Sequence, residues 1–373
     1  MNKLLKKIDG ERLLLGLAAP VLAVVTALVV TALVLLASGK EPFQAFNVML
    51  DYGSKADSQI YILNKATTYY LAGIAVALGF RMNLFNIGVD GQYRMAAFFA
   101  AVVGAQLHLP GVLHILVIVL VAMLVGAMWA GIAGLLKVTR GVSEVISTIM
   151  LNAIATSVIA YLLSPGRLAE LDASGNVSTK VIPDSGHLFN IATKGGSLYG
   201  FIFVAVIVGI AFWWGLSRTR FGFDLRTAGG SDSAALASGV NVKRMVVTAM
   251  LLSGAIAGLV GMPELLNNSY QYSLNFPTGI GFTGISVALL GRNNPIGVAI
   301  GALLWAFIER ATGHLEFAGY DKEIAGVVQG VIVLAVVIAY ELVRRYGLRR
   351  QQSRVGRQLA AQAVPSKNQE VSA

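Results

Sequence analysis

The sequence predicts an all-α polytopic membrane protein with about ten membrane crossings, inverted repeats and broken helices. Its 373 residues are 56% hydrophobic and only 13% charged, whereas soluble domains average about 25% charged residues. Residues 13–37, 197–216 and 245–263 contain no Asp, Glu, Lys or Arg, and about 20 apolar residues span a bilayer core. Because backbone amides in hydrocarbon need internal partners, we expect these segments to be helices.

The first apolar segment follows three basic residues, Lys3, Lys6 and Lys7, as a signal peptide would. Its apolar run, residues 13–37, is longer than the roughly 7–15 residues of a signal-peptide core. We therefore expect an uncleaved first helix. The chain has no cysteine, which excludes disulfides and thiolate metal sites.

Ten crossings fit the hydrophobic pattern. They also define a cytoplasmic N-terminus (1–12), a membrane domain (13–343) that includes a cytoplasmic segment (217–244) and an external loop (164–196), and a basic tail (344–373) that we expect to be disordered. The predicted crossings are 13–37, 60–80, 84–107, 112–136, 142–163, 197–216, 245–263, 279–291, 295–308 and 324–343.

The net charge of +10 is distributed as in a membrane protein. Most of the basic residues lie in 1–12, in 217–244 and in the tail after Glu341, each next to an apolar segment. Cytoplasmic loops of membrane proteins carry this excess of Lys and Arg. The pattern predicts that both termini lie in the cytoplasm, and it argues against nucleic-acid binding.

Two hydrophobic stretches are interrupted in a matching way. Residues 79–92 place Asn86, Asp90 and Gln92 beside Gly88 and Gly91. Residues 279–286 contain Gly279, Gly281, Thr283, Gly284 and Ser286 before a short apolar run. Glycine-interrupted spans in corresponding positions of two halves indicate a transport site between inverted repeats. The alternative is that the glycines only allow close helix packing.

Asp90 and Arg94 are four residues apart, so they can pair on one helix face. An intramembrane charge pair is a functional candidate by default, although mutual neutralisation explains it equally well. Glu144 and Glu264 lie near the ends of crossings, where we expect them to cap or pair. The four histidines lack metal-ligand spacing, and we expect no metal site.

The segment 217–244 contains a predicted short helix. Ser231 or Asp232 can cap its free amides, Ala234, Ala235 and their neighbours favour helix, and Gly239 can end it in the left-handed conformation. Its exposed Ala and Leu surface suits docking into a groove of another protein. The alternative is an amphipathic connector that lies on the lipid headgroups.

Several segments of the chain resemble motifs of a known family. Residues 225–241, which include Gly229, resemble the coupling-helix motif of the branched-chain amino acid and ribose-type ABC permease superfamily. Residues 86–92, 144–152 and 281–291 are similar to motifs of its nucleoside-uptake branch. The resemblance covers residues 60–340. Asp90 stands where the branch more often has Glu, which keeps the charge but shortens its reach.

The resemblance implies a bacterial inner-membrane importer that works by ATP-driven alternating access. Its protein partners would be an ABC ATP-binding subunit on the cytoplasmic side, a second permease subunit in the membrane and an extracytoplasmic substrate-binding protein. The lipid bilayer would surround the two permease subunits. The chain lacks a Gly-x-x-x-x-Gly-Lys-[Ser/Thr] loop. We therefore expect no cofactor and no catalysis on this chain, with ATP and Mg on the partner ATPase.

Nucleosides are the first expected cargo, and ribose or another small sugar is the alternative. An ion-coupled secondary transporter is a less favoured alternative function. Such a transporter would need buried carboxylates to bind its ions, and only Asp90 is a clear candidate. The residues expected along the substrate pathway are Asn86, Gly88, Asp90, Gln92, Asn152, Thr283, Gly284 and Ser286. Those expected to couple the ATPase are Gly229, Ser231, Asp232, Ala234, Ala235 and Gly239.

Overall fold

The computed structural model describes residues 25–26, 28–171 and 175–320, with isolated positions between 323 and 346. The chain forms two compact units, one of Met49–His314 and one of Met1–Val48 with Leu315–Ala373. The predictions for residues 1–12 and for most of 13–37, 324–343 and the tail lie outside the described residues. Within the tail, Arg345 and Tyr346 are helical.

The smaller unit joins segments from the two ends of the chain. It includes the apolar helix Leu28–Ala37, the start of α2 (Pro42–Ser54) and the short η3 (Glu316–Ala318). Lys40 Nζ donates to the Gly319 carbonyl at 2.8 Å, and the Tyr320 hydroxyl donates to the Glu41 carbonyl at 2.9 Å. These bonds tie residues about 280 positions apart in sequence.

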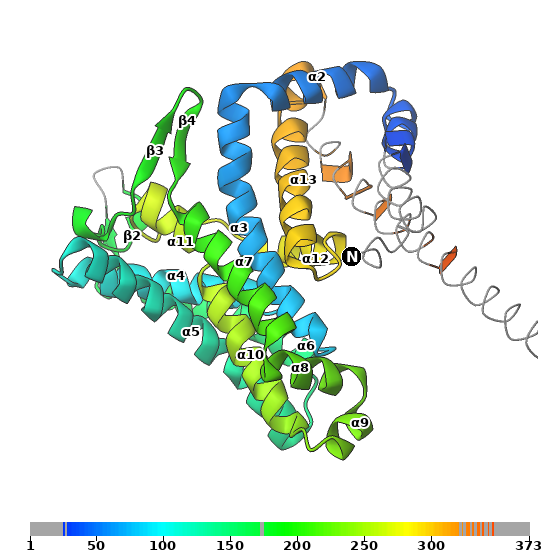
Figure 1. Cartoon of the computed structure of the whole chain (residues 1–373). Helices are drawn as coiled ribbons and strands as arrows, with labels where there is room; N and C mark the ends of the chain where they lie inside the picture. Colours follow the sequence, from blue (N-terminus) through cyan, green and yellow to red (C-terminus); the bar gives the residue numbers. More distant parts are fainter. Residues whose placement is uncertain are drawn as a thin grey trace, which may run out of the picture. The chain divides into compact units, whose positions relative to one another are not determined.

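The larger unit is a helical assembly in which α3 (Ala56–Arg81) packs against several other helices (Figure 1). Its partners come mainly from the second half of the chain. The other helices of this unit are α4 (Val89–Gln106), α5 (Gly111–Arg140), α6 (Glu144–Leu162), α7 (Phe201–Arg218), α8 (Arg220–Gly230), α9 (Asp232–Ala237), α10 (Val242–Gly258), α11 (Met262–Glu264), the π-helix η2 (Leu265–Ser269), α12 (Ile280–Leu290) and α13 (Pro295–Gly313).

Among the described residues, five helices are long and apolar enough to cross a membrane. The predicted crossings at 112–136, 142–163, 197–216, 245–263 and 295–308 fall on them; the helices are Gly111–Arg140, Glu144–Leu162, Phe201–Arg218, Val242–Ser269 and Pro295–Ala318. The crossing at 279–291 is a shorter apolar helix, and α3 and α4 are more polar and largely buried. The total of ten crossings stays a prediction.

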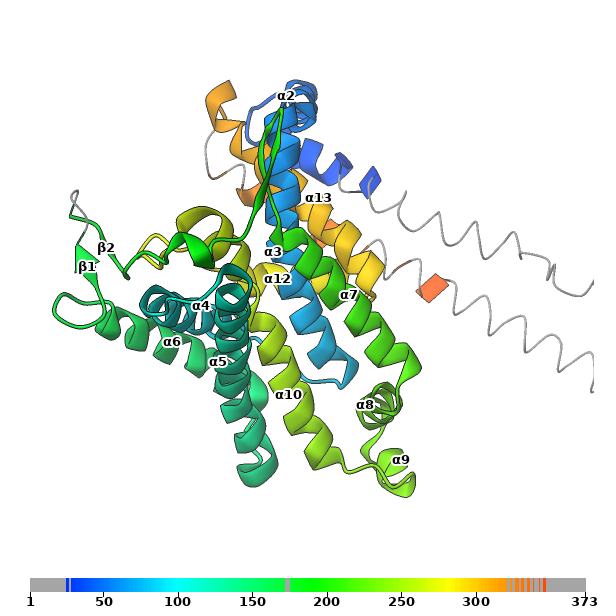
Figure 2. The ribbon, with the colours of Figure 1, turned by 60° about the vertical axis from the view of Figure 1, so that its left-hand side comes forward.

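Close packing of α5 against α10 depends on small residues. A Cβ added at Gly254 would overlap the backbone of Gly126, and one at Gly258 would overlap the Ala122 carbonyl. Small residues at such spacing let helix backbones approach closely. The two helices contact each other extensively, and in Figure 2 they diverge toward the ends farthest from the α4 label.

The segment expected as an external loop, 164–196, contains two antiparallel hairpins in place of a plain loop. They are β1 (Glu170–Leu171) with β2 (Val177–Ser178), and β3 (Asn190–Thr193) with β4 (Gly196–Tyr199); the one-turn η1 (Asp184–Gly186) lies between them. Asn64 of α3 anchors β4, because its Nδ2 donates to the Ser197 carbonyl and its Oδ1 accepts from the Tyr199 amide, both at 2.9 Å. The β3–β4 hairpin therefore lies at the end of the unit where α3 begins.

Candidate functional site

The first broken span is a real interruption of the helical path. Helix α3 ends at Arg81, Asn83 adopts a left-handed backbone with φ of 56°, and α4 begins only at Val89. The segment between them alternates exposed residues, Asn83 and Phe85, with buried ones, and the polar groups of the buried residues need partners. The side chains of the segment and of α4 supply them.

Asn86 and Gln92 form a closed amide pair. Asn86 Nδ2 donates to Gln92 Oε1 at 3.0 Å and to Ser253 Oγ of α10 at 2.8 Å, and Gln92 Nε2 donates back to Asn86 Oδ1 at 2.8 Å. Each residue is only 1% exposed. Gly88 lies beside this pair, where a Cβ would crowd Gln92 and Thr148. The pair joins the first broken span to the second half of the chain.

Asn152 of α6 secures the start of α4 from the other side. Its Oδ1 accepts a hydrogen bond from the Gly91 amide at 2.8 Å, and its Nδ2 donates to the Ile87 carbonyl at 3.0 Å. A Cβ at Gly91 would lie 2.8 Å from Asn152 Oδ1, so glycine is needed for this approach. The amide of Asn152 thus satisfies two backbone groups that the broken helix leaves free.

Replacing Asn152 with leucine is expected to lower the free energy of unfolding by about 2 kcal/mol, because two backbone groups lose their partner. Thermal unfolding of the purified protein in detergent measures this. Ser157→Ala is the control on the same helix, since within the described part of the chain the exposed Ser157 Oγ makes one hydrogen bond, to the Ala153 carbonyl one turn earlier. Equal unfolding temperatures for the two variants would contradict the role given to Asn152.

The second broken span meets the first at Asp90. A Cβ at Gly281 would overlap the Asp90 backbone, and the Gly281 amide donates to Asp90 Oδ1 at 3.4 Å. The predicted pairing of Asp90 with Arg94 is confirmed, with Oδ2 and NH1 3.9 Å apart. Arg94 NH1 also donates to Thr156 Oγ1 of α6 at 2.9 Å. The two interrupted stretches therefore lie against each other.

The predicted pathway residues fall into two groups. The side-chain amides of Asn86, Gln92 and Asn152 form hydrogen bonds with other groups of the chain. The Asp90 carboxylate likewise accepts from the Gly281 amide and pairs with Arg94. Thr283 and Ser286 are half-buried on α12, and Gly284 lies against Ala72 of α3. Direct contact of these residues with a substrate stays a prediction, whereas their contacts account for how the broken spans hold their shape.

The segment 217–244 contains the predicted short helix and one more. Ser231 caps α9 by accepting from the Ala234 amide at 3.4 Å, and Gly239 follows it with φ of 75°, both as predicted. Helix α8 precedes it and was not expected; Thr219 caps it by accepting from the Gly222 amide at 3.3 Å. Asp232 lies in the first turn of α9, where a negative charge is favourable.

The predicted exposed Ala and Leu surface needs one correction. Ala234 is exposed and Leu236 is 66% exposed, but Ala235 is fully buried against the rest of the unit. Ala235 is the one residue of α9 that is buried, and the other five residues of this helix are exposed. Phe223 of α8 is also exposed, so the apolar docking candidates are Leu236 and Phe223.

The same segment packs against the end of α3. A Cβ at Gly229 would overlap the Arg81 carbonyl, and Arg81 NH2 donates to the Asn293 carbonyl between α12 and α13 at 2.9 Å. Arg81 immediately precedes the first broken span. Arg81 therefore contacts both α8 and the connection between α12 and α13.

The two carboxylates near crossing ends behave differently. Glu144 pairs with Lys137, with 2.5 Å between Oε2 and Nζ, as expected. Glu264 accepts a hydrogen bond from Asn268 Nδ2 at 2.7 Å, and it also lines a small, partly polar cavity of about 50 Å³ between α3, β4 and α11. Sequence reasoning missed this cavity, although Tyr61, Lys65 and Thr68 follow the i, i+4, i+7 spacing of one helix face.

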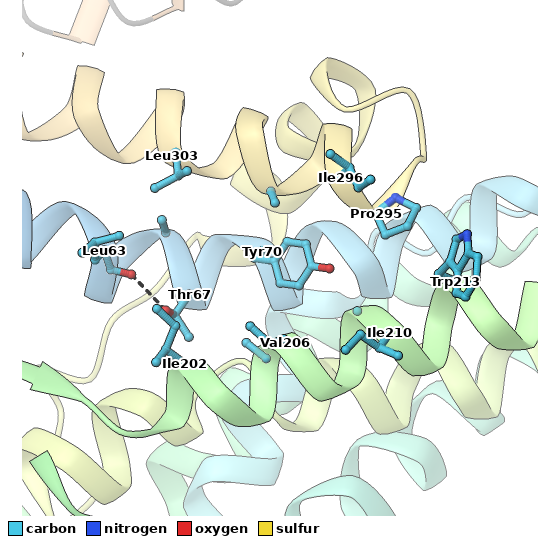
Figure 3. Close-up of a pocket in the computed structure, with 14 residues that line it drawn as sticks. Leu63, Thr67, Tyr70, Ile202, Val206, Ile210, Trp213, Pro295, Ile296 and Leu303 are labelled. Carbon is cyan, nitrogen blue, oxygen red and sulfur yellow. Dashed lines mark hydrogen bonds between the residues drawn. The ribbon is translucent and has the colours of Figure 1, made fainter. Parts of the chain in front are cut away.

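A larger cavity of about 500 Å³ is almost wholly apolar and lies between α3, α7 and α13 (Figure 3). The Tyr70 ring enters it, and the Thr67 hydroxyl is already bonded to the Leu63 carbonyl at 2.9 Å. Its remaining lining is aliphatic or Trp213. Such a surface suits hydrocarbon and offers little to a polar cargo.

Sequence reasoning also missed a half-buried carboxylate. Glu309 of α13 accepts a hydrogen bond from the Tyr69 hydroxyl of α3. Asp90 is therefore not the only acidic side chain that is at least partly buried among the described helices. Because Glu309 already has this partner, it does not by itself indicate ion coupling.

Comparisons with known proteins agree on one family. The model of the family described as branched-chain amino acid transport system / permease component matches residues 58–337. The guanosine ABC transporter permease protein NupP of Bacillus subtilis is 32% identical over 335 residues, covering 87% of this chain and 94% of the relative. The glucose ABC transporter permease protein TsgB13 of Haloferax volcanii is 30% identical, covering 89% and 90%.

A more distant relative is the ribose import permease protein RbsC of Haemophilus influenzae. It is 24% identical over 272 residues, which is 71% of this chain and 80% of the relative. No solved structure matches the chain.

Proposed function

Because this chain belongs to the branched-chain amino acid transport system permease family, it is a multi-pass membrane subunit of an ABC transporter, and we propose that its cargo is a nucleoside carried inward. The assignment of the subunit depends on a family match over residues 58–337. The nucleoside is supported by two lines of similarity. These are the motifs at 86–92, 144–152 and 281–291, and a guanosine permease that is 32% identical over nearly its whole length.

We further propose that this chain forms the substrate pathway and transmits the motion of the ATPases to it, while partner chains hydrolyse ATP and capture the substrate. The exposed Leu236 and Phe223 would dock into an ATP-binding subunit on the cytoplasmic side. Closure of the ATPases would displace α8, and Gly229 would pass this displacement to Arg81 and the broken spans. Packing of α8 against the end of α3 is the single observation that most favours this route.

Uptake of a labelled purine nucleoside tests the cargo. Cells that lack this gene are expected to lose most guanosine uptake at low micromolar concentration and to regain it when the gene is restored. Labelled ribose uptake, measured in the same cells, is the control and is expected to stay unchanged. Lost ribose uptake with normal nucleoside uptake would reject the nucleoside proposal and favour a sugar.

A small sugar is the second candidate cargo, because glucose and ribose permeases are among the relatives. Free sugars and nucleosides both present ring hydroxyls, whereas only nucleosides carry a planar base. Competition separates them: unlabelled guanosine should block uptake of labelled guanosine, and excess ribose should not.

A further inference from the structure

The polar cavity beside Glu264 lies between the two halves of the chain. Tyr61, Lys65 and Thr68 line it from α3, and Tyr199 of β4 and Glu264 of α11 face them. Tyr61 is 20 residues from Arg81, which is about 30 Å along a helix. The cavity is therefore at the end of α3 opposite to the α8–α9 segment.

Its charged groups do not pair with each other. Glu264 Oε1 accepts from Asn268 Nδ2 at 2.7 Å, and among the described residues this carboxylate has no ion pair within 4 Å. Lys65 Nζ lies 5.7 Å from the centre of the Tyr61 ring. A carboxylate and an ammonium thus line one cavity without forming a salt bridge. A ligand or water can bridge them.

Three hydroxyls of the cavity are also without internal partners, whereas the amide of Asn64, which lines it too, is bonded to β4. Within the described part of the chain, the hydroxyls of Tyr61, Thr68 and Tyr199 make no hydrogen bond. Burial, followed by the nearby Glu264 carboxylate, raises the pKa of Tyr199 to about 12, so its hydroxyl remains protonated and can donate. The contrast with Asn86, Gln92 and Asn152, whose amides are bonded inside the chain, is the observation that singles out this cavity.

The lining fits closely spaced hydroxyl groups. An ionised carboxylate accepts only, and its two oxygens can receive both protons of a vicinal diol. Lys65 can donate to the diol oxygens, and the Tyr and Thr hydroxyls can donate or accept. A volume of about 50 Å³ holds a few water molecules or a pair of hydroxyls, and it excludes a nucleobase in this conformation.

We propose that this cavity binds the vicinal hydroxyls of the pentose ring of the cargo, and that Glu264 selects for the diol. The inference builds on the proposed function, because it assumes a cargo that contains a ribose ring. The cavity would widen as α3 and α11 separate, and the base would remain outside it.

Transport of guanosine and 2′-deoxyguanosine by the complete transporter tests this, at concentrations that saturate the binding protein with each. When the binding protein is saturated, a difference between the transport rates of the two nucleosides must arise after the binding protein has delivered them to the permease. The unaltered protein should carry guanosine faster. Glu264→Gln is expected to slow guanosine about tenfold, since it removes charge-assisted hydrogen bonds, and to bring the ratio of the two rates near one. Glu170→Gln, an exposed carboxylate on β1, is the control and should change neither rate.

A second measurement separates failure of the subsite from failure of the cargo. The chain has no cysteine, so Tyr199→Cys introduces a single thiol at the cavity, which a small methanethiosulfonate reagent can label. Guanosine is expected to slow the labelling several-fold more than 2′-deoxyguanosine. If neither nucleoside is transported but guanosine protects the thiol, the proposed diol-binding cavity is supported and the proposed nucleoside cargo is rejected. If guanosine is transported, and Glu264→Gln changes both rates equally or guanosine gives no selective protection, the subsite is wrong.

Discussion

Replacing Gly254 with alanine is expected to destabilise the protein by about 3 kcal/mol, although alanine is the better helix former by about 1 kcal/mol. The added Cβ would overlap the Gly126 carbonyl of α5 and crowd Ala130. These neighbours are backbone or short side chains, so α5 and α10 must move apart. Overpacking of a tight contact typically costs 1–3 kcal/mol, and this contact joins two of the most extensively packed helices of the unit.

Gly215→Ala is the matched control, because it adds the same methyl group to a helical glycine. No atom lies within 4 Å of a Cβ at Gly215 in α7. This variant is expected to keep or slightly raise the unfolding temperature. The readouts are the amount of folded protein extracted from membranes and thermal unfolding in detergent. If Gly254→Ala and Gly215→Ala behaved alike, the close crossing of α5 and α10 would be refuted.

Replacing Leu236 with aspartate is expected to reduce uptake more than tenfold without reducing the amount of protein in the membrane. Leu236 is 66% exposed on α9, so the change disturbs little of the packing inside the chain. An aspartate buried in a partner's apolar groove would lack a partner for its charge, which is strongly unfavourable. ATP hydrolysis by the assembled transporter should no longer respond to the loaded binding protein.

Ser233→Asp places the same charge at another exposed position of α9, and it should leave uptake near normal. Ala235 is unsuitable for this test, because its side chain is buried and a larger residue would disturb the segment itself. Normal uptake by the Leu236→Asp variant would show that α9 does not form the docking contact.

Local features of the chain were predictable from the sequence. The Ser231 cap, the left-handed Gly239 and the Asp90–Arg94 pair each involve residues within a few positions of one another. Their geometry follows from backbone preferences and helix spacing. The apolar segments of α5, α6, α7, α10 and α13 were also predictable, because hydropathy is a property of the segment itself.

Helix α8 was missed for a local reason. Its sequence is rich in Gly and Arg, with mixed polarity, and it resembles a connector more than a helix. Packing of Leu225, which is fully buried, and the Thr219 cap stabilise it. Tertiary contact here outweighs weak intrinsic helix propensity.

The roles of the polar residues in the core depended on partners that are distant in sequence. Hydropathy, charge placement and motifs were enough to identify a multi-pass helical membrane protein of this permease family with two interrupted stretches. Contacts between distant segments were needed to find that Asn86 bonds Ser253, 167 positions away, and that Glu264 and Lys65 line one cavity without forming an ion pair. A buried amide and a ligand-binding one look the same in sequence, because both are polar residues in an apolar stretch. They differ only in whether another part of the chain satisfies their hydrogen bonds, and that is a property of the folded chain.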